Sequence, residues 1–87
     1  MTRDDQLKVI KQSMNITGEY LDGPLGAKLD DVRQRLIGFG VPESVVDSDT
    51  AIGVICTCVD DLYNYKKLSD YAHMCIANLI YEKEDVE

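Results

Sequence analysis

The chain has 87 residues, 45% of them hydrophobic and 29% charged, which is the composition of one small globular domain spanning residues 1–87. Nine basic and sixteen acidic side chains give a formal net charge of −7. That charge argues against a protein that grips nucleic-acid phosphates or an anionic membrane, because both require a basic surface. No apolar run approaches the roughly 20 residues of a membrane-spanning helix. The charged start, Thr2 to Asp5, does not resemble a signal peptide, so we expect a soluble protein made in the cytoplasm.

The first helix is predicted from its start signal and its apolar spacing. Thr2 is a suitable N-cap, and Asp5 stands where the acidic partner of a capping box belongs. Spacings of three and four residues then give one apolar stripe, formed by Leu7, Ile10 and Met14. Gly18 is expected to end this helix in the left-handed conformation, and residues 19–23 read as a loop.

The second helix has the clearest amphipathic pattern of the sequence. Pro24 is expected at its start, where a missing N–H costs nothing. The apolar stripe repeats with steps of four and three residues and consists of Leu25, Leu29, Val32, Leu36 and Phe39. Gly38 and Gly40 are expected to end the helix, and residues 42–46 predict a single turn or a short helix.

Two further helices complete the chain. Residues 50–64, capped by Ser48 or Asp49, are apolar around more than half of the helix circumference, which predicts a central helix packed from several sides. Ser69 is expected to cap a last helix that runs to about Lys83, followed by a frayed acidic tail over residues 82–87. No segment alternates with period two. The predicted fold class is therefore all-α, a small bundle of four main helices plus a short one, with a central apolar helix over about residues 50–64.

The cysteines and the single histidine predict neither a metal site nor an active site. Cys56 and Cys58, like His73 and Cys75, are two residues apart, and such pairs on a helix point about 200° away from each other. Three cysteines within apolar segments are better read as reduced core residues than as a disulfide framework. Phosphate-cradling glycine loops and the common hydrolase motifs are missing from the sequence. We expect no enzyme activity, no catalytic residue, no metal and no cofactor.

One alternative function rests on Ser48. Acyl carrier proteins are small, acidic and four-helical, and carry an Asp-Ser pair at a helix start, where the serine receives phosphopantetheine. Asp47 and Ser48 reproduce that pair, but Asp49 stands where a leucine is expected. A carrier protein modified on Ser48 is one alternative, and a small helical cytosolic adaptor is the other.

Two groups of residues predict partner surfaces. Lys28, Arg33 and Arg35 lie away from the apolar stripe of the second helix and form the densest basic cluster of the chain. Tyrosines gather near the end of the central helix and on the last helix, and tyrosine is favoured at interfaces; they are Tyr63, Tyr65, Tyr71 and Tyr81. Residues 1–46 carry a net charge of −1 and residues 47–87 carry −6. This asymmetry suits a head-to-tail contact between copies, in which the basic cluster meets acidic residues of the neighbouring subunit.

The order of motifs along the chain resembles the head–tail connector (adaptor, or head-completion) proteins of tailed bacteriophages and prophages. The resemblance covers about residues 7–81, although only Tyr65 and Lys66 stand where relatives often have a longer Gly/Ser-containing insert. It is carried by the order and spacing of these segments: Leu7-x-x-Ile10-Lys11, Asn15-Ile16-Thr17-Gly18, Tyr20 and Asp22, Gly40-Val41, Asp49-x-Ala51-Ile52-Gly53, Val59-x-Asp61-Leu62-Tyr63-Asn64, and Lys67-Leu68-Ser69-x-Tyr71.

The resemblance implies a structural virion protein without catalytic residues. Such a protein forms a homo-oligomeric ring beneath the portal at the capsid vertex, joins the portal protein to the stopper or tail proteins, and helps to retain the packaged DNA. Its location would be the head–tail interface of the virion after synthesis in the bacterial host cytoplasm. An acidic channel would let DNA slide without sticking. We therefore expect acidic side chains to face the lumen or the portal, the candidates being Asp60, Asp61, Asp70, Glu82, Glu84 and Asp85.

Overall fold

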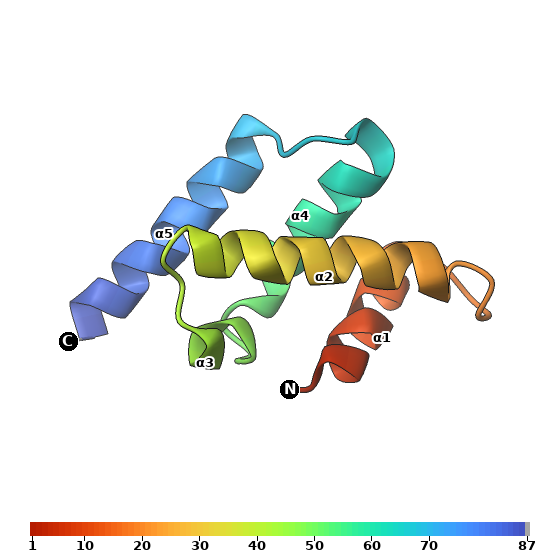
Figure 1. Cartoon of the computed structure of the whole chain (residues 1–87), viewed down its shortest axis with the longest axis horizontal. Helices are drawn as coiled ribbons and strands as arrows, with labels where there is room; N and C mark the ends of the chain where they lie inside the picture. Colours follow the sequence, from red (N-terminus) through yellow and green to blue (C-terminus); the bar gives the residue numbers. More distant parts are fainter. Residues whose placement is uncertain (87) are drawn as a thin grey trace.

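The computed structural model describes the backbone of residues 1–86 and the side chains of residues 1–80. In this range it contains five helices and no strand, which confirms the predicted all-α class (Figure 1). The helices are α1 (Arg3–Ser13), α2 (Asp22–Gly38), α3 (Glu43–Val46), α4 (Ile52–Tyr65) and α5 (Asp70–Val86). Within the described residues no helix is both long and apolar enough to cross a bilayer.

The predicted central helix is α4, which contacts α1, α2 and α5 (Figure 1). Ile55, Val59 and Leu62 are at most 3% exposed on α4, and they pack with the buried stripe of α2. That stripe is formed by Leu25, Leu29, Val32 and Leu36, at the four- and three-residue steps of the sequence pattern. Truncating one of these side chains to alanine typically costs about 2–5 kcal/mol of stability.

The ends of α1 differ in how well the sequence predicts them. Thr2 and Asp5 form the predicted capping box, in which the Thr2 hydroxyl accepts from the Asp5 N–H at 3.1 Å. At the other end Asn15, with φ of 57°, takes the left-handed position expected of Gly18. The Ile16 N–H reaches back to the Lys11 carbonyl at 2.9 Å, so the helix stops three residues earlier than predicted. Gly18 is also left-handed, but it lies in the loop that follows.

The end of α2 carries Phe39 out of the core. Gly40 is left-handed with φ of 104°, and the Val41 N–H donates to the Leu36 carbonyl at 3.0 Å, closing a Schellman motif. Phe39 is the last residue before this reversal and is 49% exposed. The prediction that Phe39 continues the buried stripe is therefore wrong, and Val41 takes the buried place instead.

The connection between α3 and α4 also departs from the prediction. Neither Ser48 nor Asp49 caps the central helix, because α4 begins at Ile52 after Ala51 and has no side-chain cap. The Ser48 hydroxyl instead donates to the Val45 carbonyl at 2.6 Å, which closes the end of α3.

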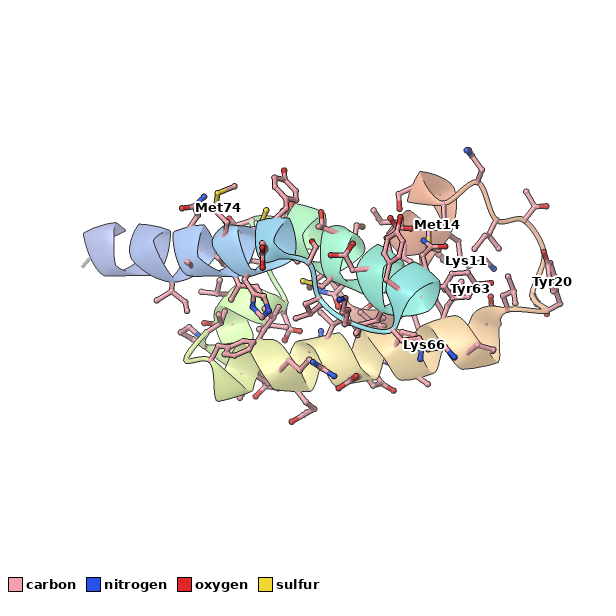
Figure 2. All side chains as sticks on the ribbon, turned by 90° about the horizontal axis from the view of Figure 1, so that it is seen from above. Lys11, Met14, Tyr20, Tyr63, Lys66 and Met74 are labelled. Atoms are coloured by element: carbon pink, nitrogen blue, oxygen red, sulfur yellow. The ribbon has the colours of Figure 1, made fainter. Side chains whose placement is uncertain are left out.

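Helix α5 starts at the predicted cap and extends away from the bundle. The Ser69 hydroxyl accepts from the Ala72 N–H at 3.1 Å. Helix α5 runs antiparallel to α4, and its second half passes beyond the ends of α2 and α3 along the 41 Å long axis (Figures 1 and 2). Its backbone is helical to Val86, past the predicted end at Lys83.

Candidate interaction site

The predicted basic cluster of α2 is largely engaged within the chain. Arg33 is only 17% exposed at its side chain; it lies 2.8 Å from the Asp47 carboxylate and donates to Gln6 Oε1 at 2.7 Å. Arg35 pairs with Asp31 one turn earlier at 3.1 Å, and Lys28 is half-buried. Arg33 therefore departs from the expectation of a contact with a neighbouring subunit, because its acidic partner belongs to the same chain.

Gln6 is the polar centre that the sequence analysis missed. Its side chain is fully buried, and Nε2 donates to the Val46 carbonyl at 2.8 Å while Oε1 accepts from Arg33. Through these bonds it joins α1, α2 and α3. A polar residue at a position one turn before Ile10, on the predicted buried face, was the available signal.

The acidic residues named as lumen candidates fall into different environments. Asp60 and Asp70 are exposed, and the Asn64 amide donates to Asp60 Oδ1 at 2.7 Å. Asp61 is only 9% exposed and accepts two hydrogen bonds from Ser69. Asp61 is therefore corrected from a channel-facing residue to one that ties α4 to the start of α5. The side chains of Glu82, Glu84 and Asp85 lie outside the described residues.

The predicted tyrosines are exposed where the structure describes them. Tyr63, Tyr65 and Tyr71 are 37%, 69% and 61% exposed, while the side chain of Tyr81 lies outside the described residues. Tyr63 and Tyr65 occupy the last turn of α4, and Lys66 and Lys67 follow directly. We call these four residues the tyrosine–lysine turn. Lys66 is left-handed, with φ of 61°, so the chain leaves the helix abruptly at this point.

A second apolar surface lies between the end of α2 and α5. A shallow hollow of about 200 Å³ is lined by Phe39, His73, Ile76, Ala77 and Ile80, and we call it the α2–α5 hollow. The rings of Phe39 and His73 meet edge to face, with centroids 6.3 Å apart. The hollow is smaller than the roughly 300–1,000 Å³ of typical small-molecule sites, so it suits a protein side chain better than a cofactor.

The two surfaces lie on different parts of the molecule. In the view of Figure 2 the end of α4 that carries Tyr63 and Lys66 lies towards the loop that carries Tyr20, whereas α5 projects in the opposite direction. The sequence did not predict the hollow, because the apolar stripe places Phe39 in the core and His73 was considered only as a metal ligand or an active-site residue. Tyr20 and Met74 are also exposed, at 78% and 52%, and the sequence did not predict either of them as a surface residue.

The thiols are reduced and mostly enclosed. Cys58 of α4 is buried, while Cys56 and Cys75 are half-buried. Burial, with the nearby Asp61 carboxylate, raises the pKa of Cys58 to about 12, and burial also raises the pKa of Cys56. Among residues 1–80 no group of three His, Cys, Asp or Glu side chains is placed to hold a metal ion.

No protein-family model, curated protein or solved structure matches this chain. The two exposed surfaces and their charges are therefore the observations from which a function is argued. The Ser48 hydroxyl, bonded to a carbonyl of its own chain before α4 begins, lacks the placement at a helix start on which the carrier alternative rests.

Proposed function

We propose that this chain is a structural subunit that associates head to tail with copies of itself into a ring. In this proposal it works as a head–tail connector of a tailed phage or prophage: the ring joins the portal protein to the stopper or tail proteins and helps to retain the packaged DNA. The sequence resemblance supplies the class of assembly. The observation that carries the proposal is that one small domain exposes two separate surfaces, the aromatic and basic turn at the end of α4 and the apolar α2–α5 hollow.

The amount of exposed apolar surface supports an assembly role. Among the described side chains, eight large apolar residues are at least 37% exposed, in a chain of only 87 residues. Contiguous exposed apolar surface commonly marks an interaction site. The eight exposed residues divide between the first residue, the α1–α2 loop, the end of α2, the end of α4 and the first two turns of α5. One partner on one face would therefore not cover all eight.

The separation of the surfaces favours a head-to-tail geometry. The tyrosine–lysine turn and the α2–α5 hollow are different patches, and a contact between unlike patches propagates from one copy to the next. Such a chain of contacts closes into a ring when the rotation per subunit permits. The net charge of −7 keeps non-matching faces apart, which limits random association.

Light scattering after size exclusion, with negative-stain imaging of any large species, tests this function. We expect a species several times the 9.8 kDa monomer mass that images as rings. A protein that stays monomeric at its highest soluble concentration would overturn the ring proposal, and capture of a single unlike partner by the monomer would point to an adaptor.

The acidic surface gives a second test of the same function. In the proposal, exposed Asp60 and Asp70 face the channel or the portal and keep DNA phosphates from adhering. Replacing both residues by lysine should give rings that bind duplex DNA at low salt in a gel-shift assay, whereas unmodified rings should not. If the double variant binds no more DNA than the original protein, these two residues do not face the channel.

A further inference from the structure

We propose that the tyrosine–lysine turn of one copy docks into the α2–α5 hollow of a second copy. The inference deepens the proposed function and rests on it, because it names the two surfaces through which the subunits join.

The hollow has the chemistry of a receptor for an aromatic side chain. Phe39 stands 49% exposed at its rim, and Ile76, Ala77 and Ile80 supply an aliphatic floor from one face of α5. The edge-to-face contact between Phe39 and His73 leaves a hollow open to solvent. Burying a further ring against these side chains removes apolar area from water on both partners.

The tyrosine–lysine turn has the shape of a ligand for such a hollow. Tyr65 is 69% exposed at the last residue of α4, and the left-handed Lys66 turns the backbone sharply after it. The aromatic ring therefore stands at a corner of the domain rather than along a helix face. Tyrosine also loses little conformational entropy when it is buried, which favours it as an anchor.

The charges around the two surfaces are complementary. None of the ion pairs found among residues 1–80 includes Lys66 or Lys67. Beyond Ile80, the last residue of the hollow, α5 continues to Val86, and the sequence of this stretch is acidic, with Glu82, Glu84 and Asp85 against the single Lys83. The carbonyl end of a helix adds partial negative charge. Two lysines beside an incoming tyrosine match this acidic helix end, whereas a second α5 would bring like charges together.

The occupant must come from another copy. Phe39, which lines the hollow, follows the end of α2, and in Figures 1 and 2 that end of α2 and the end of α4 lie at opposite sides of the molecule. A turn held at the end of α4 by the short link to α5 cannot fold back into the hollow of its own chain.

Photocrosslinking tests the contact. The photoreactive amino acid p-benzoylphenylalanine replaces Tyr65 in the full chain, the protein is irradiated, and the cross-linked peptides are mapped by mass spectrometry. We expect a covalent dimer in which residue 65 is joined to Phe39 or to residues 73–80. The matched control places the same group at Tyr20, which is 78% exposed in a different loop and should give no product at these residues.

Two sets of variants tie the cross-link to the proposed chemistry. Ala77→Trp fills the hollow and should abolish the cross-link, whereas Ala27→Trp on an exposed part of α2 should leave it unchanged. The double change Lys66→Glu and Lys67→Glu affects only exposed side chains, so it keeps the fold and should abolish the cross-link at low salt. Circular dichroism confirms the helical content of each variant.

The cross-link and the assembly size separate this inference from the proposed function. Rings in which residue 65 joins the hollow support both. Rings without that cross-link overturn the docking contact and leave the ring proposal standing. A closed dimer with the cross-link supports the contact and overturns the ring. A monomer without the cross-link overturns both.

Discussion

The carboxylate of Asp61 accepts both polar hydrogens of Ser69, from the backbone N–H at 3.1 Å and from the hydroxyl at 2.7 Å. The same Ser69 oxygen accepts from the Ala72 N–H, so one residue is bonded both to the preceding helix and to the one it caps. These bonds connect the two ends of the four-residue link between α4 and α5. This arrangement fixes where α5 begins relative to α4.

Removing the Asp61 carboxylate should destabilise the fold. We expect Asp61→Ala to lower the free energy of unfolding by about 2 kcal/mol, because the Ser69 N–H and hydroxyl lose their acceptor at a partly buried corner. Urea unfolding followed by circular dichroism measures this. Asp60→Ala is the matched control and should cost less than about 0.5 kcal/mol, since Asp60 is exposed. Equal costs for the two variants would contradict the role given to Asp61.

The Gln6–Arg33–Asp47 network should be more sensitive than the neighbouring surface pair. We expect Arg33→Ala to cost about 1–3 kcal/mol, because it leaves the buried Gln6 Oε1 without its donor and Asp47 without its cation. Arg35→Ala removes only an exposed pair one turn apart and should cost about 0.3–0.5 kcal/mol. Chemical denaturation of the two variants side by side decides this; a smaller loss for Arg33 than for Arg35 would refute it.

The three thiols should react in a definite order. Burial and the Asp61 carboxylate hold the pKa of Cys58 at about 12, so at pH 8 roughly one part in ten thousand is thiolate. We expect the half-buried Cys56 and Cys75 to react with a disulfide reagent in the folded protein, and the buried Cys58 to react only after unfolding in urea. Mass spectrometry of the labelled peptides gives the order. Early labelling of Cys58 in the folded protein would show that the core around α4 opens readily.

Acid should weaken the contact between α1 and α2. The Arg3 guanidinium donates to Asp30 at 2.6 Å and lowers the pKa of that carboxyl below its ordinary 3.8. A lowered pKa in the folded state means that the stabilisation is present above pH 3.8 and is lost as the pH falls through the lower folded value. Because the pair is exposed, we expect it to contribute about 0.5 kcal/mol at pH 7.

Thermal unfolding of the Asp30→Asn variant measures this contribution. The variant should be less stable than the original protein at about pH 7, and the difference should shrink as the pH falls below 3.8 and Asp30 takes up a proton. A difference that persists unchanged in acid would show that the substitution disturbs the fold in some other way.

Much of this fold follows from local sequence. Where the structure departs from the predictions, the cause is also local. The Leu25 to Leu36 stripe and the cap at Ser69 were predictable because the apolar period and the cap signal agree with the packing. Phe39 could not be placed from periodicity, because the chain reverses at the next residue, Gly40, and this reversal takes Phe39 out of the apolar stripe. Ser48 is a residue type that often caps a helix, but its hydroxyl donates to the Val45 carbonyl, before α4 begins.

The candidate site was less predictable than the fold. The exposure of the tyrosines at the end of α4 was expected from residue type. The partners of Arg33 and Asp61 were not, because Gln6 is 27 residues away from Arg33 and Ser69 belongs to the next helix. The α2–α5 hollow combines a residue from the end of α2 with four from α5, a juxtaposition that exists only after folding.

The geometry of α5 makes the corner at Ser69 the fulcrum of a lever. The helix has 17 residues and therefore a length of about 26 Å, and much of it extends past its neighbours. A tilt of roughly 10° at the fulcrum displaces the far tip by about 4 Å, which is close to the width of a side chain. Small changes in the bonds that Ser69 makes would thus be magnified into a change of spacing or angle between whatever the two ends of α5 hold.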